Sequence, residues 1–166
     1  MTTHRRQRGA LAACLLCTLF LLAGCGKEQA DPDPDQLAAY LTQQLHFRDE
    51  LSPLSEEMAQ AVYGYLPDML SKGAVYVSSG ASAEEVAVLT AKERAGVSEL
   101  EKITARRTQD QRDAFINYLP EEVDLLKAPY LRQVGNTLIY CVGADKEACD
   151  KAVEEFLSSM EEEPAL

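Results

Sequence analysis

Apolar residues at helical spacing alternate along this chain with short runs of β-branched residues. The stretches with helical spacing cover approximately residues 34–46, 55–63, 98–119 and 146–160. The β-rich runs cover residues 74–77, 86–89, 130–134 and 137–142. Turn residues separate the β-rich runs within each pair, so the pattern predicts two hairpins, each followed by a helix. We therefore expect an α+β fold: a two-layer sandwich with a small antiparallel sheet and helices packed on one face, preceded by one or two short helices.

Helix ends are marked by capping residues. Asp33 precedes Pro34 and suits the N-cap of the first helix. Ser55 suits the N-cap of the second helix, which Gly64 would close. Asp145 suits the N-cap of the last helix.

The apolar face of the long third helix carries two polar residues, Arg107 and Gln111. Buried polar groups need hydrogen-bond partners. One interpretation is structural, with both side chains bonded to loop carbonyls or to a carboxylate such as Glu85. The alternative is functional, with Arg107, Gln111, Glu85 and Tyr118 lining a cleft that binds a ligand.

The amino terminus has the pattern of an export signal. Three arginines precede an almost wholly apolar run over residues 9–22, which ends in Leu22-Ala23-Gly24-Cys25. Those four residues resemble the lipobox of bacterial lipoproteins. The resemblance implies cleavage before Cys25 and attachment of a diacylglyceryl group, with fatty acyl chains such as palmitate, to its thiol. An uncleaved signal anchor or an ordinary secretory signal would also fit the apolar run, but neither explains the cysteine.

These features divide the chain into four parts. Residues 1–24 form the signal peptide, 25–34 a lipidated N-terminus with an Asp/Pro spacer, 35–160 a single α+β domain, and 161–166 an acidic tail. Beyond residue 24 the chain carries 13 basic and 27 acidic residues, a formal charge of −14. This charge argues against nucleic acid and against electrostatic docking on anionic lipid.

Few residues of the mature chain suit catalysis or metal binding. His46 is the only histidine after residue 24, which excludes sites that need a pair of histidines. No nucleophile or phosphate-binding motif appears, so we expect no catalytic residue, metal or cofactor. Cys141 and Cys149 can form a disulfide in an oxidising exterior, or can both serve as small buried hydrophobes.

Three groups of residues between Met58 and Val142 resemble a family. They are Tyr63-Gly64; Gly80-Ala81-x-Ala83-Glu84-Glu85-Val86-Ala87-Val88; and Arg107-x3-Gln111-x3-Phe115-x2-Tyr118-x-Pro120-x-Glu122. The family so resembled is an uncharacterised domain of unknown function in lipoproteins of Gram-positive bacteria. It carries no catalytic assignment, so the resemblance implies a compartment but no mechanism.

Together these observations favour an extracytoplasmic lipoprotein on the cell membrane. We expect a non-catalytic binding or accessory module of the cell envelope, held to the lipid bilayer by its anchor and engaging an envelope protein. The alternative is a lipoprotein that binds a small solute or a peptide.

Overall fold

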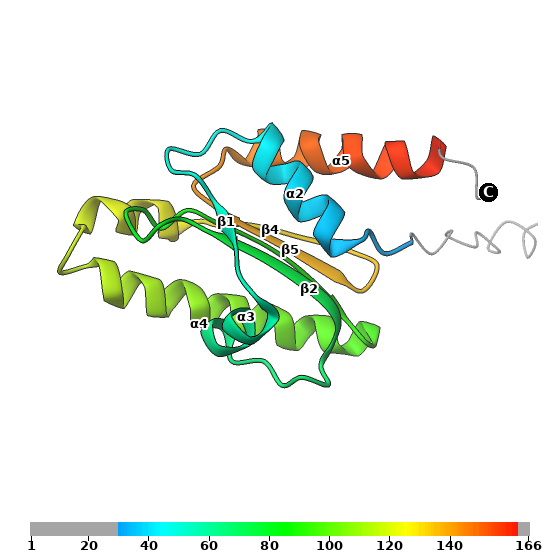
Figure 1. Cartoon of the computed structure of the whole chain (residues 1–166), viewed down its shortest axis with the longest axis horizontal. Helices are drawn as coiled ribbons and strands as arrows, with labels where there is room; N and C mark the ends of the chain where they lie inside the picture. Colours follow the sequence, from blue (N-terminus) through cyan, green and yellow to red (C-terminus); the bar gives the residue numbers. More distant parts are fainter. Residues whose placement is uncertain (1–29, 163–166) are drawn as a thin grey trace, which may run out of the picture.

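A five-stranded antiparallel sheet lies at the centre of the computed structural model, which describes residues 30–162 (Figure 1). The strand order is β1-β2-β3-β5-β4. The pairs β2–β3 and β4–β5 confirm the two expected hairpins. The strands are β1 (Ser52–Pro53), β2 (Leu70–Val77), β3 (Glu85–Ala91), β4 (Tyr130–Val134) and β5 (Thr137–Val142).

Helices cover both faces of this sheet. Helices α2 (Pro34–Gln44) and α5 (Lys146–Glu162) lie on one face, while α3 (Glu56–Tyr63) and α4 (Val97–Phe115) lie on the other (Figure 1). The α+β class is confirmed, but the layers are three rather than the expected two. The physical reason is that β3 and β5 are apolar along nearly their whole length, so both of their faces need cover.

Two apolar clusters result, one on each side of the sheet. The α2/α5 core includes Leu37, Leu41 and Val153 together with Val86 and Val88 of β3. The α3/α4 core takes the alternate residues of the same strand and packs them against the other helices; its members include Ala87, Leu89, Leu100, Ile103 and Leu126. The change of side at every residue is the ordinary alternation of a strand.

The capping residues act as the sequence predicts. The side chain of Asp33 accepts a hydrogen bond from the Gln36 amide at 3.1 Å, and Ser55 caps α3 in the same way. Gly64 closes α3 in the left-handed conformation, with φ of 66°. The carboxylate of Asp145 accepts from the Ala148 amide at 3.0 Å.

The third helix is shorter than expected. Helix α4 ends at Phe115 rather than near Leu119, and a 3-10 helix, η3 (Pro120–Lys127), follows. A shorter 3-10 helix, η2 (Arg94–Gly96), precedes α4. Because Pro120 lacks an amide hydrogen and restricts the residue before it, the α-helix cannot run through this point.

The end of the Asp/Pro spacer packs on the domain. Asp31 accepts a hydrogen bond from the Asn136 amide at 2.5 Å, and Asp33 pairs with Lys72 at 2.6 Å. The expected signal peptide and Cys25 lie outside the described residues, as do residues 163–166 of the acidic tail. Within residues 30–162, no helix is long and apolar enough to cross a membrane.

Candidate functional site

Three side chains from two helices meet at Glu85, the first residue of β3. The Glu85 carboxylate is fully buried and accepts a hydrogen bond from the hydroxyl of Tyr63 on α3. On α4, Arg107 donates through Nε at 3.1 Å and Nη2 at 2.7 Å, and Gln111 donates through Nε2 at 2.8 Å. We call Tyr63, Glu85, Arg107 and Gln111 the Glu85 network.

The sequence places these groups together by simple spacing. Arg107 and Gln111 are four residues apart, so they lie one turn apart on the same face of α4. Glu85 points to that side because it shares the parity of Ala87 and Leu89, which belong to the α3/α4 core. The network therefore closes one end of the α3/α4 core.

Charges in this network compensate one another. Burial lowers the pKa of Arg107, but the hydrogen bonds and charge of Glu85 outweigh it, so the pKa is raised overall. Burial and the neighbouring Glu85 charge raise the pKa of Tyr63 well above its ordinary value. The phenol therefore stays protonated and donates. The buried Glu85 carboxylate thus has three donors: Tyr63, Arg107 and Gln111.

Gln111 has one polar atom without a partner. Because a carboxylate ion can only accept, the Gln111 amide nitrogen must face Glu85 and its oxygen must point away. That oxygen is buried, and no described residue donates to it. Such an orphan acceptor is unusual in a folded protein and calls for an explanation.

A cleft of about 250 Å³ opens beside the network. Arg107 and Gln111 contribute its polar wall, while its apolar wall comes from Phe115 at the end of α4, Val62 on α3, Val77 at the end of β2 and Leu54 just after β1. Asp110, an exposed residue, also lines it. We call this hollow the α4 cleft. The structural and functional interpretations of Arg107 and Gln111 thus meet in one place, since both residues brace Glu85 and line a cleft.

Tyr118 does not join this site. Its side chain is 73% exposed, and it lies beyond the end of α4. The expectation that it shares a face with Arg107 assumed a helix that continues to Leu119. Because α4 stops at Phe115, the helical phase is lost before Tyr118 is reached.

A second group of carboxylates was not foreseen from the sequence. Glu84 accepts hydrogen bonds from the amides of Arg48 and Asp49 at 2.9 Å each. Glu122, on η3, accepts from Arg48 Nη2 at 2.7 Å and from the Ala83 amide at 2.9 Å. These contacts, which we call the Glu84–Glu122 clamp, fasten two loops and η3 together at one end of the sheet.

The clamp restricts the residue at position 143 and shifts the pKa of Glu122. At Gly143, φ is 92° and a Cβ atom would lie 2.6 Å from Cγ of Glu84, so only glycine fits. Burial raises the pKa of Glu122, but the Arg48 and Ala83 donors lower it by more, so the net direction is downward. The signal in the sequence was the adjacency of Glu84 and Glu85, which strand alternation sends to opposite sides.

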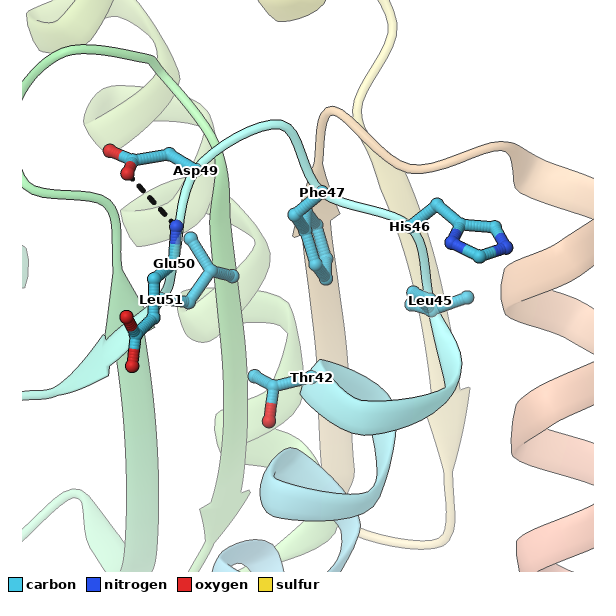
Figure 2. Close-up of a pocket in the computed structure, with 7 residues that line it drawn as sticks. All are labelled: Thr42, Leu45, His46, Phe47, Asp49, Glu50 and Leu51. Carbon is cyan, nitrogen blue, oxygen red and sulfur yellow. Dashed lines mark hydrogen bonds between the residues drawn. The ribbon is translucent and has the colours of Figure 1, made fainter.

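The lone histidine of the described chain lies in another hollow, of about 220 Å³, on the loop after α2. Figure 2 shows the exposed imidazole of His46 and the carboxylate of Asp49 pointing away from one another at opposite ends of this loop. Asp49 instead accepts hydrogen bonds from the hydroxyl and amide of Ser79, which lower its pKa. The hollow therefore holds no histidine–carboxylate pair.

Cys141 on β5 and Cys149 on α5 both lie in the α2/α5 core as free thiols. The disulfide considered from the sequence is not formed in this structure, and the two residues pack as small apolar groups. The neighbouring Cys149 thiol and burial raise the pKa of Cys141 well above its ordinary value. Over residues 30–162, no group of three or more histidine, cysteine or acidic side chains could hold a metal ion.

Most of the polar residues that carry the family resemblance gather in the two polar clusters, Tyr118 being the exception. Tyr63, Glu85, Arg107 and Gln111 form the Glu85 network, and Glu84 and Glu122 belong to the clamp. The sequence pattern of this family therefore describes the polar supports at one end of the sheet.

Comparison with known proteins yields one finding. Neither the curated proteins nor the solved structures contain a match to this chain. A family pattern does match, over residues 43–143, which is well over half of the chain and includes the whole Glu85 network. The chain belongs to the DUF4358 family, a domain of unknown function.

Proposed function

We propose that this protein is a membrane-tethered, extracytoplasmic binding module of the cell envelope, without catalytic activity of its own, that holds its partner in the α4 cleft. The observation that carries the proposal is the composition of this cleft. Apolar walls surround two polar side chains, Arg107 and Gln111, that are held rigidly from behind by Glu85. Binding sites typically combine an apolar lining with a few fixed polar groups.

The tether is supported by the amino-terminal sequence. A basic start, an apolar run and Leu22-Ala23-Gly24-Cys25 together match a lipoprotein signal. A diacylglyceryl anchor supplies two acyl chains, and stable membrane attachment requires about that many.

Binding is favoured over catalysis by the state of the buried carboxylate that braces the polar wall of the cleft from behind. A general acid or base must reach the substrate with a free proton site. Glu85 already accepts from Tyr63, Arg107 and Gln111, so it braces the site instead of facing a substrate. His46, the only histidine among the described residues, lines the other hollow and not the α4 cleft.

The size of the cleft favours a protein partner over a free solute. Ligand pockets that enclose a small molecule usually measure about 300–1,000 Å³. At about 250 Å³, the α4 cleft accommodates only part of a larger molecule. A small-solute binder, the second candidate, would need a deeper cavity.

The tether is tested by replacing Cys25 with Ala in the full-length protein. We expect the variant to leave the membrane fraction or to be mislocalised, whereas wild type carries a lipid mass on its mature N-terminus. Cys149→Ala, which removes a thiol far from the signal, should stay in the membrane. Wild-type protein recovered in the secreted soluble fraction without lipid would refute the tether.

The binding role is tested with a cleft-filling variant and a matched control. Ala114 is exposed on α4 and lines the cleft, so Ala114→Tyr should obstruct it without replacing any residue of the Glu85 network. Ala105 is exposed on the same helix and lies half a revolution away from Ala114, so Ala105→Tyr makes the same replacement outside the cleft. We expect cross-linking in membranes to capture a stoichiometric partner with wild type and Ala105→Tyr but not with Ala114→Tyr. A hydrolase screen run in parallel should show no turnover; turnover that Ala114→Tyr abolishes would overturn the proposal.

A further inference from the structure

We infer that the α4 cleft recognises an uncharged main-chain amide together with an apolar side chain, that is, an extended peptide segment of a partner protein. This inference rests on the proposed function, because it names the class of ligand that the same cleft takes.

The acceptor half of the recognition comes from Gln111. Its amide nitrogen is fixed against Glu85, so its oxygen points away from the network with no donor among the described residues. An amide N–H from a ligand would satisfy it. A buried acceptor without a partner is destabilising, so a donor bound there recovers an interaction that the free protein lacks.

The donor half comes from Arg107. Its Nε and Nη2 atoms bond to Glu85, and within residues 30–162 its Nη1 atom makes no hydrogen bond. The side chain is 19% exposed, so it can be reached from the cleft that it lines. A guanidinium has five N–H donors, and those not spent on Glu85 suit a carbonyl oxygen.

An acceptor beside a donor matches an amide, which has one of each. A carboxylate or phosphate ligand fits poorly, because Glu85 already neutralises Arg107 and because Asp110 and Glu84 also line the cleft. A neutral amide avoids this cost and uses both the acceptor and the donor.

The apolar wall of the cleft favours an apolar side chain next to the bound amide. Leu54, Val62, Val77 and Phe115 offer hydrocarbon surface rather than hydrogen bonds to sugar hydroxyls. The cleft has room for about one side chain and its amide. A peptide segment that inserts one aliphatic or aromatic residue satisfies these features together.

A small local movement admits the ligand. The Gln111 oxygen is closed to solvent, so a donor must displace a neighbouring side chain. Phe115 lies one helical turn from Gln111, lines the cleft and is only partly buried. Rotation of one such side chain is common when proteins bind partners.

Four defined probes test the ligand class by NMR titration of the isotope-labelled full chain in detergent micelles. They are N-acetylleucine methylamide, N-acetylglycine methylamide, N-acetylaspartate methylamide and N-acetylglucosamine. The leucine probe should bind with a Kd of about 1 mM and shift signals of cleft residues. The glycine and aspartate probes should bind at least about tenfold more weakly, because they lack the apolar side chain or add a negative charge. N-acetylglucosamine has an amide but no apolar side chain, and should bind weakest.

Two variants with matched controls connect this binding to named atoms. Gln111→Met keeps the side-chain size but removes the orphan oxygen, and should weaken the leucine probe by about threefold to tenfold. Gln109→Met makes the same change at an exposed position outside the cleft and should have no effect. Should Gln111→Met fail to fold, Ala114→Tyr, which should abolish probe binding while Ala105→Tyr retains it, carries the test.

Three results would overturn the inference: no saturable binding of the leucine probe, stronger binding of the aspartate probe, or stronger binding of N-acetylglucosamine. Failure here is distinguishable from failure of the proposed function. If a membrane partner still depends on Ala114 while the leucine probe does not bind, the cleft is a binding site but its ligand is not an amide of this kind.

Discussion

The two faces of the sheet are built in different ways. The α2/α5 core consists of apolar side chains and two free thiols, among them Leu41, Val153 and Cys149. The α3/α4 core has similar apolar members but ends in the Glu85 network, where a buried carboxylate, a guanidinium, an amide and a phenol meet. The cleft lies on this second side, next to the network.

The difference separates two sources of stability. Apolar burial on the α2/α5 side is gained without precise geometry, and volume and pattern largely suffice. The Glu85 network is favourable only while every partner is present, because a buried charge that loses its counterion is strongly destabilising. The proposed binding surface thus lies against the part of the core that tolerates change least.

The largest expected effect is on the network side. Glu85→Ala removes the carboxylate and leaves Arg107 and Tyr63 without their acceptor, so we expect a loss of about 3–5 kcal/mol in the free energy of unfolding. Urea denaturation followed by circular dichroism measures it. The control is the double variant Glu85→Leu with Arg107→Leu, which removes both charges and should be more stable than the single variant. A loss below about 1 kcal/mol in Glu85→Ala would show that the network contributes little to the fold.

A cavity on the opposite face should cost somewhat less and leave the cleft intact. Leu41 is fully buried in the α2/α5 core, so Leu41→Ala should lower the free energy of unfolding by about 2–4 kcal/mol. Leu41→Met, which nearly conserves volume, should cost under about 1.5 kcal/mol. Binding of the leucine probe should be unchanged in both. Loss of binding in folded Leu41→Ala would mean that the two faces are coupled.

Acid should weaken the Glu84–Glu122 clamp. The pKa of Glu122 is lower in the folded protein than its ordinary value of 4.5, so its ionised form stabilises the fold at neutral pH. That contribution is complete above the unfolded pKa and is lost as pH falls through the lower, folded pKa. Glu122→Gln should therefore flatten the fall in thermal stability below about pH 4.5. Glu121→Gln, which changes an exposed neighbour by the same charge, should not; equal slopes in the two variants would contradict this role.

The smallest effect is expected at an exposed ion pair. Lys72 bridges Asp33 and Asp35 with N···O distances of 2.6 and 2.9 Å, and the contact between Arg107 and Glu85 measures 2.7 Å. All three side chains are exposed to water, so Lys72→Ala should leave the urea midpoint of unfolding almost unchanged. The difference should shrink further in high salt. A cost comparable to that of Glu85→Ala would show that distance matters more than burial.

Much of the fold could be predicted from local sequence patterns. Ser55 and Gly64 mark the two ends of α3 because capping depends on neighbours in sequence. The hairpins followed from β-rich runs and turn residues. The number of layers did not, although Val86-Ala87-Val88-Leu89 is a continuous apolar run and such a run indicates burial on both faces. Strand β1 could not be anticipated because it has two residues and exists only by pairing with β2.

Part of the candidate site could be predicted from the sequence. Arg107 and Gln111 stood out because they interrupt an apolar helical face. Tyr63 did not, since it belongs to a regular helix and only the tertiary fold brings it to Glu85. The clamp was missed for the same reason, as Arg48 and Glu122 are 74 residues apart. Contacts that depend on how elements pack leave no periodic trace in the sequence.

The bond between Asp31 and the Asn136 amide has a consequence for how the domain is oriented. It fixes the chain to the turn between β4 and β5, next to Thr137, while Glu85 and the α4 cleft beside it lie at the opposite end of the central strands. Between the proposed lipid at Cys25 and Asp31 there are six Cα steps, which span at most about 20 Å. With the proposed lipid attached at Cys25, a tether of this length would keep the Thr137 end of the sheet near the bilayer and direct the cleft outward. Lengthening it would let the domain tilt more freely without changing which end faces the lipid.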